Sequence, residues 1–302
     1  MFLHISTAYC RCQLEVLEEK LYNPVHNPRK IIDLVDWMDD KTLDYIEPKV
    51  IESEPNTYSY TKAITEDLVA EYANKFPVAI ARPSIVVAAW KEPVPGWIDN
   101  MQGPTGLFVG TGKGVIRSML CNSSYLIDAM AVDIVVNALS MSRRVIAVSK
   151  LDKSNKNLYV LGQKLYNEYP FTVALWYIGG TLKSYWITHQ ICVILFQIIP
   201  AYLIDALLFL FRRETAMVRI QKRISHGLGV LQYYTTKKWH FTNKRFRTLH
   251  ERINKKDDEE FFTDVSAVNP EEFFKNMIIG IRKFVVKEDP SNLPRARKLN
   301  NM

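Results

Sequence analysis

Cysteine is scarce in this sequence, and the few cysteines are not spaced like the ligands of a metal site. The 302 residues include four cysteines, Cys10, Cys12, Cys121 and Cys192. Two close together and two isolated form neither a zinc-binding set nor a dense disulfide framework. The six histidines show no metal-ligand spacing either. We therefore expect a reducing compartment and no metal site.

Two motifs are also missing. Met1 leads directly into the apolar segment Phe2-Leu3-His4-Ile5, with no basic or long hydrophobic region before it, so we predict no signal peptide. No G-x-G-x-x-G motif follows a predicted strand. The glycine-rich run ending at Gly114 is no Walker loop, because Leu107 replaces the first glycine and Gly114 stands where serine or threonine is needed.

The formal charge of +7 is unevenly distributed. The basic excess follows residue 211, at Arg212, Arg213, Arg219, Lys222, Arg223, Lys237, Lys238, Lys244, Arg245 and Arg247. Such a patch suits nucleic acid, an anionic membrane surface or an anionic substrate. The apolar segment beside it favours a membrane lipid surface, and we expect no nucleic-acid partner.

That apolar segment, residues 187–211, exceeds the length of about 20 residues needed to cross a bilayer. Its polar interruptions are His189, Gln190, Gln197, Pro200 and Asp205. Two interpretations stay open, a buried amphipathic hairpin broken at Pro200 and a membrane-associated segment bordered by Arg212 and Arg213. Within the second, shallow association is favoured over a full span, because Asp205 would be costly at depth.

The most informative helix is predicted to start at Asn56 or Thr57 and to end near Tyr72. Tyr58 and Lys62 are four residues apart and so share a face of it. A lysine ammonium one turn from a phenol favours the ionised form, which makes tyrosine a usable acid or base.

Spacing alone is not specific. The same interval separates Tyr45 from Lys49, Tyr233 from Lys237, and Tyr234 from Lys238. Pro48 is expected to break any helix containing Tyr45. Only the Tyr58 helix leads into a continuous apolar run, which begins at Val78 and is typical of a buried parallel strand.

The remaining pattern indicates an α/β fold with a truncated Rossmann-like parallel sheet. A strand over 2–5 ends in Ser6-Thr7, and the strand from Val78 ends in Arg82-Pro83-Ser84. Ligands bind at this carboxyl edge of open parallel sheets. We also predict amphipathic helices over 15–21 and 31–38, a helix over 131–142 and a short last strand over 157–162.

Several ordered motifs resemble the alcohol-forming fatty acyl-CoA reductases of animals, which are extended short-chain dehydrogenases/reductases. They are Ser-Thr-Ala-Tyr from Ser6, Pro-Asn-Thr-Tyr-x-x-Thr-Lys ending at Lys62, Ala-Arg-Pro-Ser-Ile-Val from Ala81 and Gly-Pro-Thr-Gly-Leu from Gly103. The segment from Ile199 to Asp205 and the motif Trp239-x-Phe241-x-Asn243 continue the likeness, which covers the chain to about Arg297.

The resemblance implies roles for these residues. Tyr58 donates a proton to the oxyanion, and Lys62 assists Tyr58 and holds the nicotinamide ribose. Thr7, with Ser6 as the alternative, hydrogen-bonds the substrate carbonyl. The family uses NADPH and reduces long-chain fatty acyl-CoA through an aldehyde to fatty alcohol and CoA.

Pro83, Ser84 and Ile85 are then expected beside the nicotinamide. Lys113 or Arg117, at the glycine-rich loop, is expected to contact the CoA phosphates. Because no glycine-rich cofactor turn is present, we expect a fragment that binds NADPH poorly and turns over little alone.

We expect residues 1–165 to form the catalytic domain, with an insertion over 13–54, and 166–186 to form a linker. A mainly helical domain, 187–297, would carry the hydrophobic membrane-associated segment 187–211. The family works at the cytosolic face of peroxisomes or the endoplasmic reticulum. Alternative functions are another extended dehydrogenase/reductase acting on a sterol-like substrate, or a non-catalytic lipid-surface or partner-binding scaffold.

Overall fold

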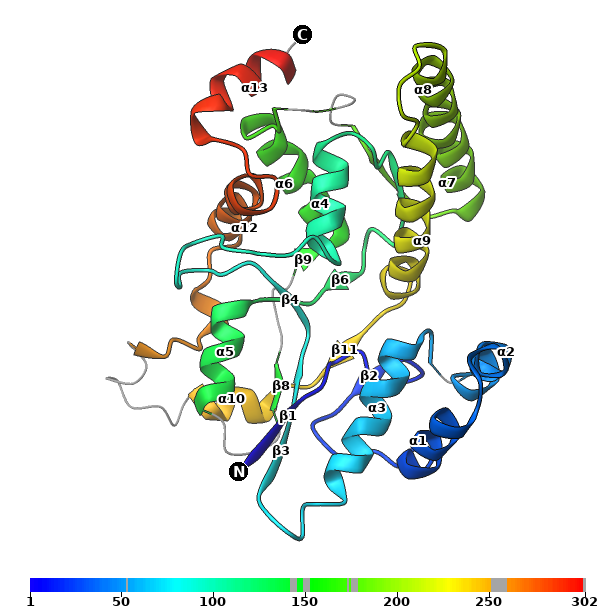
Figure 1. The fold of residues 1–302 in the computed structure, drawn as a ribbon. Coiled ribbons are helices and arrows are strands. Elements are labelled where there is room, and N and C mark those ends of the chain that lie inside the picture. Colours follow the sequence, from blue (N-terminus) through cyan, green and yellow to red (C-terminus); the bar gives the residue numbers. More distant parts are fainter. Residues whose placement is uncertain are drawn as a thin grey trace. The chain divides into compact units, whose positions relative to one another are not determined.

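The computed structural model describes residues 1–52, 54–141, 146–148, 153–172, 174, 179–250 and 260–300 (Figure 1). The chain divides into two compact units. The first joins Met1–Val86, Asp128–Leu151 and Trp239–Ala267. The second joins Val87–Ile127, Asp152–Lys238 and Val268–Met302. Helices and short parallel strands together confirm the predicted α/β class.

The first unit is built on a three-stranded parallel sheet. Its strands β1 (Phe2–Ile5), β3 (Val78–Pro83) and β8 (Ile146–Val148) lie in the order β1-β3-β8 (Figure 1). Helix α3 (Thr57–Ala70) lies between β1 and β3 in the chain, and α5 (Val132–Met141) precedes β8. Both predicted strands and both of these predicted helices are confirmed. A short pair, β4 (Ile85–Val87) with β7 (Ala129–Ala131), lies after β3.

The insertion between β1 and α3 is only partly as predicted. The helix expected over 31–38 is present as α1 (Pro28–Trp37). The helix expected over 15–21 is wrong, because Val16–Leu17 form β2, which pairs with the distant strand β11 (His240–Phe241). In addition, the buried Arg82 guanidinium donates hydrogen bonds to the backbone carbonyls of Glu18 and Lys20. A helix would need these carbonyls as acceptors for its own backbone hydrogen bonds.

Helix α2 (Asp40–Val50) contains Pro48, so the predicted break there is also wrong. Asp39 caps its start by accepting from the backbone N–H groups of Lys41 and Thr42. Pro48 lies in the last turn, where it removes one donor without stopping the chain from completing the helix. Tyr45 on this helix is 85% exposed.

The second unit contains α4 (Pro104–Gly112), α6 (Asn155–Glu168), α12 (Pro270–Gly280) and α13 (Leu293–Asn300). Its strand pairs are parallel β5–β10 (Ser118–Leu120 and Thr181–Lys183) and antiparallel β6–β9 (Leu126–Ile127 and Lys153–Ser154). The strand predicted over 157–162 is wrong, because α6 covers it. The apolar run is too short for its pattern to distinguish a helical period from the alternation of a strand. The helix extends beyond the run, and its later residues Leu165 and Tyr166 are buried.

The apolar segment forms a continuous helix from Trp186 to Leu210. It comprises α7 (Trp186–Val193), a π-helical turn (Ile194–Ile198) and α8 (Ile199–Leu210). The chain therefore does not break at Pro200. Pro200 directly follows the π turn, whose irregular hydrogen bonding accommodates the missing N–H without ending the helix.

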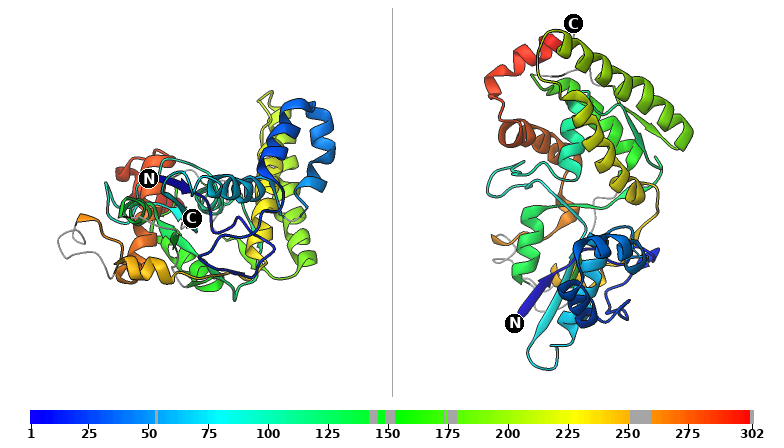
Figure 2. Two further views of the ribbon diagram at one scale, coloured as in Figure 1. Left: turned by 90° about the horizontal axis from the view of Figure 1, so that it is seen from below. Right: turned by 45° about the vertical axis from the view of Figure 1, so that its right-hand side comes forward.

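Polar and small side chains of this helix face the protein. His189, Val193, Gln197 and Ala201 are buried at four-residue intervals. One interval further, Asp205 accepts hydrogen bonds from three backbone N–H groups at the start of α9 (Met217–Thr235). Figure 2 shows α9 alongside this helix. The opposite face is apolar and exposed, with Leu203 at 61% and Leu207 at 56%.

Two glycines let a loop approach α12 closely. A Cβ added to Gly280 would lie 1.7 Å from the Gly96 carbonyl oxygen, so only hydrogen fits there. Gly96 itself has a positive φ of 78°, which favours glycine. The loop before α4 is thus held against α12 by backbone contact.

We predict that Gly280→Ala lowers the free energy of unfolding by about 1–3 kcal/mol, because the methyl group overpacks this contact. Gly227→Ala is the control. It also lies within a helix, but its Cβ meets nothing within 4 Å, so it should stabilise by up to about 1 kcal/mol. Urea unfolding followed by circular dichroism measures both, and an undiminished stability of Gly280→Ala would contradict the packing.

Candidate active site

The carboxyl edge of the first unit's sheet gathers the predicted polar residues. Pairing continues beyond β1, since the Ser6 N–H donates to the Ala81 carbonyl at 2.7 Å. Two residues on, the Ala8 N–H donates to the Pro83 carbonyl at 2.9 Å. The Ser6-Thr7 pair therefore lies beside the end of β3, which leads into Ser84 and Ile85.

The hydroxyl groups at this edge differ in their surroundings. Thr7 is buried, and its Oγ1 accepts from the Tyr9 N–H at 3.2 Å, which leaves its own proton available to donate. Ser84 is also buried, and its Oγ has no hydrogen-bond partner within the described part of the chain. Ser6 lies beside the Glu66 carboxylate and the Cys10 thiol.

Helix α3 brings Lys62 to the same edge. The Asn56 side chain caps the helix by accepting from the Ser59 N–H at 3.0 Å. The Lys62 Nζ donates to the Ile5 carbonyl at 2.8 Å, at the last residue of β1. An ammonium group has three donors, so two remain available.

The two tyrosines of this helix are placed differently. Tyr58 lies one turn before Lys62, close to the helix N-terminus, and is 54% exposed. Tyr60 is buried, and its hydroxyl bonds His26 Nδ1 at 2.9 Å. Burial raises the pKa of Tyr60. Tyr58 is thus the tyrosine that solvent or a ligand can reach.

A buried ion pair fixes α3 against β3. Arg82 Nε and Nη2 donate to the two carboxylate oxygens of Glu66 at 2.8 and 2.7 Å, and both side chains are 1% exposed. Burial alone would raise the pKa of Glu66, but the hydrogen bonds and charge of Arg82 outweigh it and hold that pKa below its usual value.

A second pair connects the next helix residue to the loop after β1. Arg11 Nη2 bonds both Asp67 oxygens, at 3.0 and 3.2 Å, with side chains 2% and 9% exposed. Together the two pairs hold α3 to both neighbours that form the site. Sequence reasoning missed this network. The available signal was a carboxylate, Glu66, on the apolar helix face that carries Ala63 and Ile64.

Aromatic residues from a distant segment cover the loop after β1. Tyr9 makes edge-on contacts with Trp239 and Phe241, at centroid distances of 5.4 and 5.2 Å. Trp239 directly precedes β11, the strand that pairs with β2, and Phe241 belongs to that strand. The Trp239-x-Phe241-x-Asn243 motif therefore packs against Tyr9, two residues after Thr7.

The two residues expected to contact the CoA phosphates lie in the second unit. Lys113 is the C-cap of α4, and Arg117 precedes β5, where its carbonyl accepts from the Thr181 N–H at 2.9 Å. Both side chains are partly exposed. The structure thus brings Ser6, Thr7, Lys62, Pro83 and Ser84 together in the first unit, and Lys113 and Arg117 belong to the second.

Sequence comparison identifies two matching family models, both described as Male sterility protein. One is an NAD-binding domain and matches residues 1–139; the other matches residues 196–288. Fatty acyl-CoA reductase 1 of Homo sapiens is 35% identical over 313 residues, which cover 99% of this chain and 61% of that protein. The chain spans about three fifths of the length of the curated relatives that it matches.

Solved structures support the fold. The terminal R domain of the myxalamid PKS-NRPS pathway matches 95% of this chain and 59% of that one, with a TM-score of 0.53 at 12% identity. The UDP-glucuronic acid 4-epimerase of Bacillus cereus, in complex with NAD, matches 96% of this chain and 62% of that one, with a TM-score of 0.50 at 10% identity. At such identity the likeness concerns the fold.

We predict that Arg82→Met lowers the free energy of unfolding by about 3–5 kcal/mol, because it leaves the Glu66 carboxylate buried without its partner. Arg29→Met is the matched control, since the Arg29–Glu71 pair at 2.8 Å has side chains 59% and 39% exposed. Its loss should be at most about 1 kcal/mol. Urea denaturation measures both, and equal losses would contradict the assigned importance of the buried pair.

The same pair predicts a pH dependence. Because the folded-state pKa of Glu66 is lowered, its contribution is complete above the unfolded value of 4.5 and is lost as pH falls through the folded value. Urea denaturation from neutral to acid pH should show a smaller acid-induced loss in Glu66→Gln than in the parent protein. An identical pH dependence would contradict the pKa assignment.

Proposed function

The chain belongs to the fatty acyl-CoA reductase family, and we propose that it serves NADPH-dependent reduction of long-chain fatty acyl-CoA to fatty alcohol and CoA, through an aldehyde. The observation that carries this proposal is the Lys62–Ile5 hydrogen bond of 2.8 Å. It brings Lys62 to the strand edge where Thr7 and Ser84 lie, and Tyr58 lies one turn earlier on the same helix. The geometry thus supports the residues that the resemblance implies.

The residues at the strand edge fit the nicotinamide end of a cofactor. Ser84 Oγ is buried and has no hydrogen-bond partner within the described part of the chain, so a ligand could supply one. The backbone at Pro83 and Ile85 flanks it. Lys62 retains two donors suited to ribose hydroxyls. When bound, the reduced cofactor supplies hydride to the substrate carbonyl carbon.

The chain's own groups then handle the carbonyl oxygen. Thr7 donates its free proton to that oxygen and orients it, with Ser6 as the alternative donor. Tyr58 donates a proton as the oxygen gains negative charge. In the first reduction this proton passes to the CoA sulfur as the C–S bond breaks and the aldehyde forms, and in the second reduction it stays on the alcohol oxygen. The charge left on the Tyr58 oxygen is stabilised by Lys62 one turn away and by the N-terminus of α3.

The apolar helix supports association with a lipid surface. Its outward face carries large apolar side chains, and Arg212 and Arg213 follow it directly. An apolar face bordered by cations suits the boundary between acyl chains and anionic headgroups. The length and composition of the helix would also permit it to cross a membrane. Because Asp205 is hydrogen-bonded to the start of α9, we favour a helix that lies on the membrane surface. We place the protein at the cytosolic face of the peroxisome or the endoplasmic reticulum.

We predict that Tyr58→Phe reduces fatty alcohol formation by about 10²–10⁴-fold, because the proton donor is lost while the ring remains. The matched control is Tyr45→Phe, which changes a tyrosine with the same spacing to a lysine on the exposed helix α2. Fatty alcohol from cells expressing each variant is measured by mass spectrometry. Provided that the parent protein raises fatty alcohol above the level of cells that lack it, comparable output from Tyr58→Phe and Tyr45→Phe would refute the assigned role.

We predict that Leu203→Asp with Leu207→Asp weakens binding to anionic phospholipid vesicles at least tenfold, since two charges enter the apolar face. Replacing Ile32 and Val35, exposed apolar residues of α1, with Asp is the control and should leave binding unchanged. Vesicle co-sedimentation measures the partition. If the α8 variant partitions like the parent protein, another surface must bind the lipid.

A further inference from the structure

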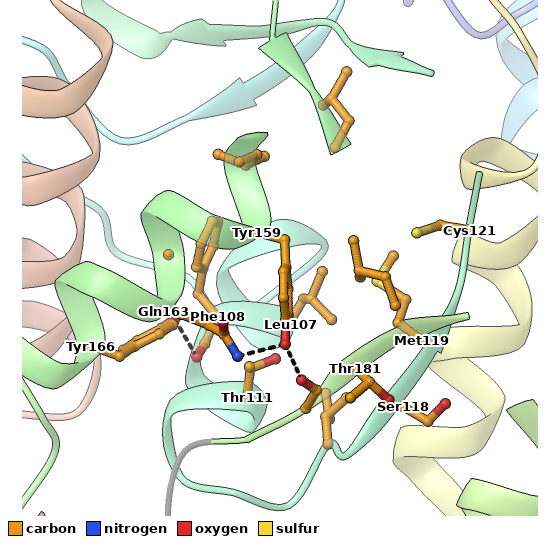
Figure 3. Close-up of a pocket in the computed structure, with 16 residues that line it drawn as sticks. Leu107, Phe108, Thr111, Ser118, Met119, Cys121, Tyr159, Gln163, Tyr166 and Thr181 are labelled. Atoms are coloured by element: carbon orange, nitrogen blue, oxygen red, sulfur yellow. Dashed lines mark hydrogen bonds between the residues drawn. The ribbon is translucent and has the colours of Figure 1, made fainter. Parts of the chain in front are cut away.

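The second unit contains an apolar pocket of about 110 Å³ between α4, α6 and the β5–β10 pair (Figure 3). Its walls are formed mainly by large apolar side chains, including Leu107, Phe108, Ile116, Met119, Leu158 and Leu182. All of its lining residues belong to the second unit. The pocket is therefore distinct from the polar strand edge of the first unit.

The polar groups of the lining are largely occupied by one another. Figure 3 shows the Tyr159 hydroxyl donating to the Gly180 carbonyl and accepting from Gln163 Nε2. Tyr166 donates its hydroxyl proton to the Phe108 carbonyl at 2.6 Å. These groups have protein partners, so a ligand gains little by offering hydrogen bonds to them.

The wall formed by β5 has the same character. Ser118 Oγ bonds His189 Nδ1 of α7 at 2.8 Å, and both residues are buried. Burial raises the pKa of the neighbouring Cys121 thiol to about 11, so that group stays neutral. Ser118 and Cys121 thus offer a ligand no charge, so this wall suits a hydrocarbon better than a charged group.

We propose that this pocket binds the hydrocarbon end of a long-chain acyl group. The inference rests on the proposed function and adds to it the site that would recognise the acyl chain. Burial of each methylene group is worth about a fourfold gain in affinity. Affinity should therefore rise with chain length until the pocket is full and then level off.

Gly162 offers a direct way to fill the pocket. It lies within α6 and lines the cavity, and a Cβ added there meets nothing within 4 Å. A leucine side chain at this position therefore enters the space that the ligand would use. Gly112 would be a poor choice, because its Cβ would lie 2.4 Å from the Phe171 ring.

The test uses cis-parinaric acid, a fluorescent straight-chain fatty acid, displaced by saturated fatty acids of increasing length. We expect the parent protein to bind longer chains more tightly, by about fourfold for each methylene that enters the pocket. Gly162→Leu should bind the longest chains at least tenfold more weakly and the shortest nearly as before. Gly229→Leu is the control, since Gly229 lies in the exposed helix α9 with nothing within 4 Å of its Cβ. It should bind like the parent protein.

Three results would overturn the proposal. They are unchanged binding by Gly162→Leu, absence of binding by the parent protein, and stronger displacement by cholesterol than by any fatty acid. Circular dichroism melting of each variant verifies that it is folded. The assay needs neither cofactor nor turnover, so its failure is distinguishable from failure of the reductase proposal, which the Tyr58 variant tests.

Discussion

The buried pair of Glu66 and Arg82 is the constraint on which the candidate site depends. It joins the middle of α3 to the last part of β3 with two hydrogen bonds, and both groups are removed from water. Two desolvated charges are tolerated only when each satisfies the other. The pair thus fixes the position of α3, and with it the place at which Lys62 meets the end of β1.

Much of this arrangement follows from local signals in the sequence. Asn56 caps α3, the run from Val78 forms a buried parallel strand, and Tyr58 and Lys62 share one face, as their spacing predicts. Ser6 and Thr7 were expected beside the end of the next strand, and the backbone pairing with Ala81 and Pro83 places them there.

What the sequence could not predict depends on partners far along the chain. Val16–Leu17 form a strand only because His240–Phe241 come to pair with them, and Arg82 binds carbonyls that an isolated segment would use for a helix. The continuity of the helix through Pro200 likewise depends on a π turn and on contacts with α9. No periodicity in a short window records such contacts.

The central claim is that Tyr58 and Thr7 act on one carbonyl oxygen. A crystal structure with oxidised cofactor and a fatty aldehyde bound tests it most directly. The account predicts that the Tyr58 Oη and the Thr7 Oγ1, or the Ser6 Oγ in its place, both lie within about 3.2 Å of the aldehyde oxygen. A Tyr58 side chain turned away from the aldehyde, with the oxygen bound by other groups, would contradict it.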